Sequence, residues 1–172
     1  MSPRWPRVLL AAAVVCTALA IQLGVLGRLR LPGADPDVVL VVVVATALSW
    51  GPMGGALVGF GAGLLVDLVP PADHSAGRVA LTLALVGYLA GLLRPEATRS
   101  ALLPLAVVAA AAVAAVMISA GVGTLLGDPR VRWPAVWRGL PAAALYDVVL
   151  TPFVLPGVAA LCRRLEPELA GR

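Results

Sequence analysis

Two aspartates lie in otherwise apolar stretches and are the side chains of this sequence best suited to chemistry. Asp67 closes one apolar run, and Asp147 lies inside another. An ionisable group in lipid is costly, and a charged partner or a bound proton lowers that cost. Tyr146, Asp147 and Thr151 are spaced to share one broad helix face. Asp67, Tyr146 and Asp147 are therefore our candidates for functional polar residues in the membrane or at its boundary.

The two aspartates are expected at different depths. About 22 Å of helix separates Asp67 from Pro52, which places Asp67 near the far interface. There it has either a specific role or the plain role of a solvated carboxylate paired with Arg78. Asp147 is expected to lie deeper, and its burial requires a partner or protonation.

The remaining ionisable residues do not form a catalytic or metal-binding set. His74 is the only histidine, and Asp67, Asp73 and His74 would give a metal ion an incomplete shell. The sequence contains no Ser/His/Asp pattern, phosphate-binding loop or paired acid/base carboxylates. We therefore expect no catalytic residue, no metal and no cofactor, and interpret the chain as non-enzymatic. A proton relay between Asp67 and Asp147 stays open.

The composition is that of an integral membrane protein. Of the 172 residues, 60% are hydrophobic and 13% are charged, and the mean hydropathy is +0.97. Soluble domains are roughly 45–50% apolar. The net charge of +4 comes from scattered arginines, which suit lipid headgroups and topology better than nucleic acid. Cys16 and Cys162 are isolated in or beside apolar segments and predict neither a disulfide framework nor a metal site.

Apolar runs predict six membrane-spanning helices in one polytopic domain, residues 1–172. Only a helix or a closed barrel satisfies the backbone in lipid, and the sequence lacks the alternation of a barrel. All four tryptophans fall at predicted span ends, as in the aromatic belts of membrane proteins. The fold is predicted to be an all-α six-helix bundle, with spans at about 8–26, 37–50, 53–69, 79–93, 101–126 and 140–161.

The connections carry helix start and stop signals. Asp35 or Asp37 is expected to start the second helix, and Gly51 and Pro52 to turn the chain into the third. Residues 130–139, with two tryptophans among three arginines, are expected to lie on the membrane surface, and residues 163–172 to form a charged tail. With both termini inside, seven arginines lie inside and six outside, so the count does not decide the topology.

Glycines recur every fourth residue in the third predicted span. Gly55, Gly59 and Gly63 form one helix stripe, and Gly87 with Gly91 forms a second small-residue pair in the fourth span. Small residues at this spacing let two helix backbones approach closely. The stripe is a predicted packing groove, either against the fourth or sixth span of this chain or against a partner protein.

These segments resemble the rod shape-determining protein MreD family, most closely its actinobacterial branch. The resemblance rests on residues 59–68, which end in a Gly-x-x-x-Asp element, on Gly77 in the next loop, and on Gly87-Tyr88-Leu89-Ala90-Gly91. Leu145-Tyr146-Asp147 with Pro152 is similar to the closing pattern of the family, where the residue after Tyr is often Asn. The resemblance covers nearly the whole chain in length and span order.

The resemblance implies a non-enzymatic membrane scaffold of the rod or spore-wall elongation complex, which helps to determine cell shape. Expected partners are an MreC-like bitopic protein, MreB, RodA and a class B penicillin-binding protein. The implied fold is similar to the substrate-binding S components of energy-coupling-factor transporters. The implied location is the bacterial cytoplasmic membrane, with both termini cytoplasmic.

An alternative from another class is a substrate-binding subunit of a vitamin-type transporter. Such a protein needs a polar pocket between spans. The candidate lining residues are Gln22, Asp67, Thr82, Tyr88 and Asp147. A third reading, an enzyme acting on lipid headgroups, lacks the clustered carboxylates that would hold a divalent metal.

Overall fold

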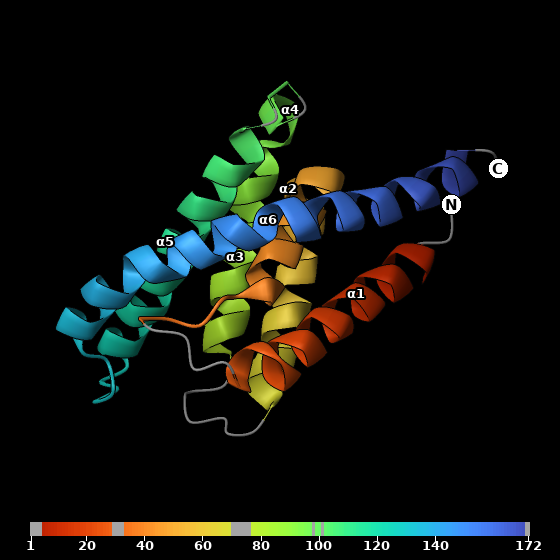
Figure 1. The fold of residues 1–172 in the computed structure, drawn as a ribbon. Helices are drawn as coiled ribbons and strands as arrows, with labels where there is room; N and C mark the ends of the chain where they lie inside the picture. The colour runs from red at the N-terminus through yellow and green to blue at the C-terminus, as the bar shows by residue number, and fades with distance from the viewer. Residues whose placement is uncertain (1–4, 29–32, 70–76, 98, 101, 171–172) are drawn as a thin grey trace.

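The chain is mostly helical in the parts that the structure, a computed structural model, describes. These are residues 5–28, 33–69, 77–97, 99–100 and 102–170, with the backbone alone described at 27 and 165–170. Four helices are long and apolar enough to cross a membrane, which confirms the predicted all-α multi-pass membrane fold. In order, the elements are α1 (Trp5–Gly24), η1 (Leu26–Arg28), α2 (Val38–Leu68), α3 (Arg78–Leu92), α4 (Arg94–Ala97), α5 (Leu103–Leu125) and α6 (Trp133–Ala170) (Figure 1).

The helix α2 is a hairpin of two helices that meet at Gly51. Gly51 has φ 82° and ψ −173°, a backbone region that is essentially restricted to glycine. Pro52 follows in the first turn of the second half, where its missing N–H costs nothing. A Cβ on Gly55 would touch Ala47, so the second half folds back along the first. The predicted turn at Gly51 and Pro52 is confirmed.

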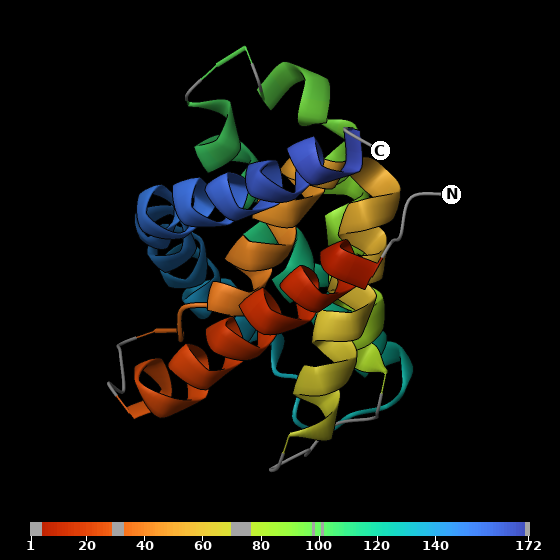
Figure 2. The same ribbon diagram turned by 90° about the vertical axis from the view of Figure 1, so that its right-hand side faces the viewer.

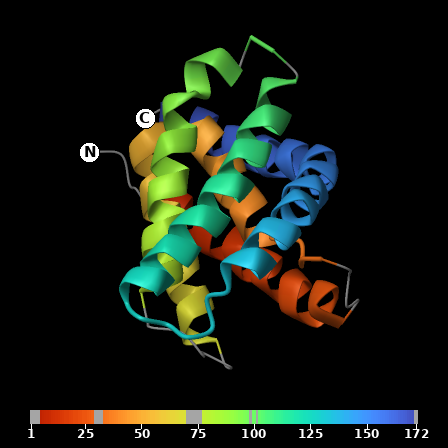
Figure 3. The same cartoon turned by 90° about the vertical axis from the view of Figure 1, so that its left-hand side faces the viewer.

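The first half of α2 is the central helix of the bundle. Its side chains are buried without interruption from Val38 to Ala47. Figure 2 shows α1 and α6 crossing one side of the molecule, and Figure 3 shows α3 and α5 on the opposite side. A helix that is hydrophobic all round is expected in the interior of a protein. Residues 38–50 span only about 20 Å, and protein encloses them.

The last helix differs from the sequence prediction. Residues 130–139 were expected to form a separate surface segment and residues 163–172 a tail, but α6 runs without a break from Trp133 to Ala170. Prolines at 134, 141, 152 and 156 lie within it. Proline is tolerated in membrane helices because neighbouring groups satisfy the freed backbone carbonyls. The other helix bounds lie within a few residues of the predicted spans, and the crossing of the bilayer by each stays a prediction.

The start of α1 and the end of α6 lie at the same end of the bundle. Figures 1 and 2 place the N-terminal start of α1 and the C-terminal end of α6 on the same side of the molecule. The hairpin turn lies at this end too, since α1 begins beside Trp50 and Arg94 approaches Gly51. The opposite end holds the start of α2, the end of its second half and the start of α3. An even number of passes is consistent with this arrangement.

Candidate functional site

Asp67 anchors the start of α3. Its Oδ2 accepts the backbone N–H of Gly77 at 2.9 Å and of Ala80 at 3.1 Å, and its Oδ1 accepts that of Val79 at 3.3 Å. The first N–H groups of a helix have no partner within the helix and carry its positive dipole end, so a carboxylate is well placed there. Asp67 is only 3% exposed. It is therefore a buried cap supplied by the preceding helix, not a solvated surface carboxylate.

Arg78 does not neutralise Asp67 in the way that the sequence suggested. Its guanidinium lies 2.9 Å from Asp128 and donates a second bond to Ser119 at 3.0 Å. Asp128 also accepts the backbone N–H of Arg130, and this bond, followed by the attraction of Arg78, lowers the pKa of Asp128. Arg78 therefore ties the start of α3 to the end of α5.

Asp147 belongs to a second cap, at the start of α2. Its Oδ1 accepts the backbone N–H of Asp37 at 2.7 Å, and Asp147 is 2% exposed. Asp37 is the N-cap residue of α2, as predicted, and accepts the N–H of Leu40 at 2.9 Å. Gln22 of α1 accepts the N–H of Val39 at 3.1 Å. Side chains from α1, α6 and the cap residue thus converge on the first turn of the central helix.

The three residues predicted to share a polar face of α6 are not equally buried. Thr151 is buried and donates its hydroxyl to the carbonyl oxygen of Asp147 at 2.8 Å. Tyr146 is partly buried. The sequence singled out Asp147 but did not indicate that its partner would be the backbone of Asp37, which is 110 positions away. Only the tertiary fold brings the two together.

The glycine stripe is filled by α3. A Cβ on Gly55 would collide with the carbonyl oxygen of Gly87, and one on Gly59 with that of Leu83. A Cβ on Gly63 would overlap the backbone of Ala80. Gly91 packs in the same way against Gly51 and Pro52, within 2.6 Å of a built Cβ. Of the two intramolecular partners considered, the fourth predicted span is the one in contact.

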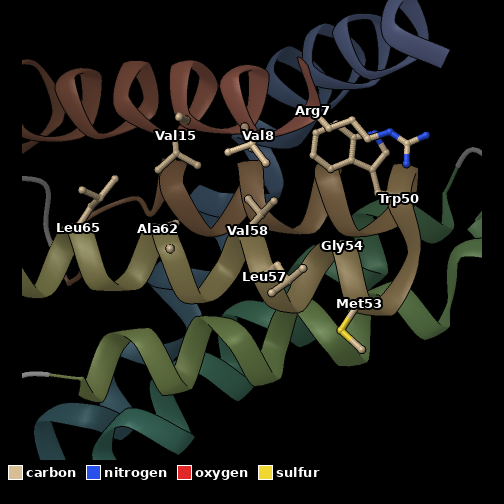
Figure 4. Close-up of a pocket in the computed structure, with 13 residues that line it drawn as sticks. Arg7, Val8, Val15, Trp50, Met53, Gly54, Leu57, Val58, Ala62 and Leu65 are labelled. Atoms are coloured by element: carbon tan, nitrogen blue, oxygen red, sulfur yellow. The ribbon is translucent and has the colours of Figure 1, made fainter. Parts of the chain in front are cut away.

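An open groove lies on the other side of the second half of α2, between it and α1. It has a volume of about 550 Å³. Figure 4 shows Val8 and Val15 on one wall, and Val58 and Leu65 on the other. Arg7 lies at one end. No local sequence pattern indicates this groove, because such patterns do not specify which helices become neighbours.

The residues considered for a vitamin pocket are not gathered in one cavity. Asp67 and Gln22 bind different helix starts, Thr82 donates to the carbonyl of Arg78, and Tyr88 is exposed on α3. His74 and Asp73 lie outside the described residues. Within the described residues, no three His, Cys, Asp or Glu side chains are grouped to hold a metal ion. Cys16 is exposed and Cys162 is buried, and no disulfide joins them.

Comparison with known proteins gives no further guide to the site. No protein-family model, curated protein or solved structure matches the chain. The chemistry of the described polar residues is therefore read from geometry alone. The aspartates accept backbone N–H groups, and the glycines admit a neighbouring backbone. These are means of fixing helices relative to one another.

Proposed function

We propose that the chain is a non-enzymatic membrane subunit that holds other membrane proteins together in a cell-wall elongation complex of the rod or spore-wall type, and so helps to determine cell shape. Its location would be the bacterial cytoplasmic membrane, with both termini in the cytoplasm. The proposed partners are an MreC-like bitopic protein and, through the complex, MreB, RodA and a class B penicillin-binding protein. The choice of this complex rests on the resemblance to the MreD family.

The observation that carries the proposal is the use of the buried polar side chains. The buried side chains of Asp67, Asp147 and Thr151 each bond to a backbone group of the same chain, so they stabilise a rigid bundle. Large apolar side chains cover the outer surfaces of the helices, among them Leu85, Phe153 and Leu145. A rigid bundle with apolar outer faces suits helix-to-helix docking within the membrane.

The geometry changes which surface is available for docking. Gly55, Gly59 and Gly63 face α3, so a partner would have to displace α3 to reach them. A bulky residue at Gly59 would therefore perturb the fold of this chain itself. The docking surface in this proposal is an outer helix face. The glycine stripe packs α2 against α3 and so helps to hold that face in place.

A photocrosslinking experiment in cells tests the proposal. A photoreactive residue at Phe153, which is 78% exposed, should crosslink to an MreC-like protein, whereas one at the fully buried Val43 should not. Depletion of the chain should round the cells or deform the spores. Normal shape and wall synthesis after depletion would refute the proposal, as would purified protein that carries a stoichiometric vitamin-like molecule.

A further inference from the structure

The groove between α1 and the second half of α2 has an apolar body and polar donors at one end only. Its walls are apolar or small side chains, such as Val8, Leu57 and Leu65. Arg7 and Trp50 line the same end, and Figure 4 shows their side chains next to one another. The groove is thus amphipathic along its length.

The Trp50 indole N–H has no acceptor within the described part of the chain. Its Nε1 is buried and without a hydrogen-bond partner among the described residues. A buried donor left unpaired costs roughly 1–3 kcal/mol, and such a group calls for an unseen partner. The neighbouring Arg7 guanidinium also supplies only donors and no acceptor. Two donor groups side by side, one of them without a described acceptor, favour an oxygen anion at this end of the groove.

The length of the groove fits one acyl chain. From Met53 to Leu65, α2 rises by about 18 Å. One leaflet contributes half of the roughly 30 Å hydrocarbon core, or about 15 Å. Tryptophan and arginine are the residues expected at headgroup level. A lipid that places its headgroup at Arg7 and Trp50 would lay one chain along the groove.

We propose that this groove is a binding site for an anionic membrane lipid, with the phosphate oxygens at Arg7 and Trp50 and an acyl chain between α1 and α2. The proposal goes beyond the scaffold function and does not depend on it. The lipid would join α1, whose outer residues are largely exposed, to the rest of the bundle.

Gly61 gives a direct means to fill the groove. It lines the groove, and a Cβ built on it meets nothing within 4 Å. Leucine at this position enters open space, so the Gly61→Leu protein should fold while its side chain occupies the path of the acyl chain. Gly59, two residues away on the other face of the helix, has no such room.

The test uses purified full-length protein in mild detergent and native mass spectrometry with added phosphatidylglycerol or phosphatidylcholine of the same acyl chains. The unaltered protein should retain one phosphatidylglycerol and release phosphatidylcholine. Gly61→Leu should abolish retention of phosphatidylglycerol. Arg7→Gln and Trp50→Phe should each weaken phosphatidylglycerol binding about tenfold, the loss expected for one charge-assisted or buried hydrogen bond. Arg99→Gln, at an exposed arginine outside the groove, is the matched control and should leave binding unchanged.

Four results would overturn the proposal. The first is equal retention of the two lipids, which would make the groove an ordinary lipid contact. The second is full phosphatidylglycerol binding by folded Gly61→Leu protein or by both donor variants. The third is binding of inorganic phosphate alone that is as strong as binding of phosphatidylglycerol. The acyl chain would then contribute nothing to binding. The fourth is a crosslink in cells from position 61 to a partner's helix in place of lipid.

Discussion

Replacement of Asp67 tests the conclusion that a buried carboxylate holds the start of α3. The Asp67→Ala change removes the acceptor of three backbone N–H groups, two of them bonded at 2.9 and 3.1 Å and one at 3.3 Å. Each N–H left without a partner in a buried site costs roughly 1–3 kcal/mol. Counting the two shorter bonds at about 1.5 kcal/mol each, we expect the free energy of unfolding to fall by about 3 kcal/mol.

The Asp67→Asn change separates charge from hydrogen bonding. The amide oxygen can take the place of Oδ2 and keep the bonds to Gly77 and Ala80. The amide NH₂ then faces the N–H of Val79, and the longest bond is lost. With the loss of a negative charge at the helix N-terminus, worth about 0.3–1 kcal/mol, the total cost should be about 1 kcal/mol.

The assay is unfolding in mixed micelles by added sodium dodecyl sulfate, followed by circular dichroism. Hydrogen exchange should also accelerate at the amides of Gly77, Val79 and Ala80. Asp35→Ala is the control, because Asp35 is exposed in the loop before α2 and should change stability by less than about 0.5 kcal/mol. If Asp67→Ala costs no more than this control, the cap does not exist. If Asn costs as much as Ala, the ionised carboxylate has a role beyond accepting these bonds.

Three other changes probe the remaining contacts. Gly59→Leu should lower the free energy of unfolding by about 3 kcal/mol, because its Cβ overlaps the backbone carbonyl of Leu83. Gly61→Leu should leave the free energy of unfolding nearly unchanged. Equal effects of the two changes would contradict the packing of α2 on α3. Asp147→Ala should cost about 1–3 kcal/mol by leaving the Asp37 N–H unpaired, with most of this restored in Asp147→Asn, and a neutral Ala variant would exclude the cap. The lowered pKa of Asp128 means that its stabilisation is complete above the unfolded value near 4 and is lost as the pH falls through the folded pKa; acid titration of unfolding should show this loss, and Asp128→Asn should remove it.

Much of the helix order follows from the sequence because membrane helices are limited by simple constraints. Hydrophobicity over residues 38–50 predicted a helix despite its valines, since lipid leaves the backbone no partner outside a helix or a closed barrel. Gly51 and Pro52 predicted the turn because each has a strong local conformational preference. Predicted and observed elements agree most closely where the cause is local.

The partners of the polar residues were not predictable in the same way. The sequence identified Asp67, Asp147 and the glycine stripe as unusual, but it did not indicate which backbone each would meet. The answer depends on which helices become neighbours, and that is decided by packing over the whole chain. The continuity of α6 was missed because tryptophans, arginines and prolines are typical both of a surface segment and of the end of a long membrane helix.

Helix length offers a physical reason for the places where aspartate is buried. The first half of α2 is about 20 Å long and α3, with 15 residues, about 22 Å, so both are shorter than the roughly 30 Å hydrocarbon core. Their first N–H groups lie in buried or partly buried surroundings, and each start receives a carboxylate from another helix. At these two helix starts, a buried carboxylate from another helix accompanies a helix that is shorter than the hydrocarbon core. Asp67 and Asp147 therefore serve the same purpose at two different helices, and the stability measurements on their alanine and asparagine variants should show the same ranking.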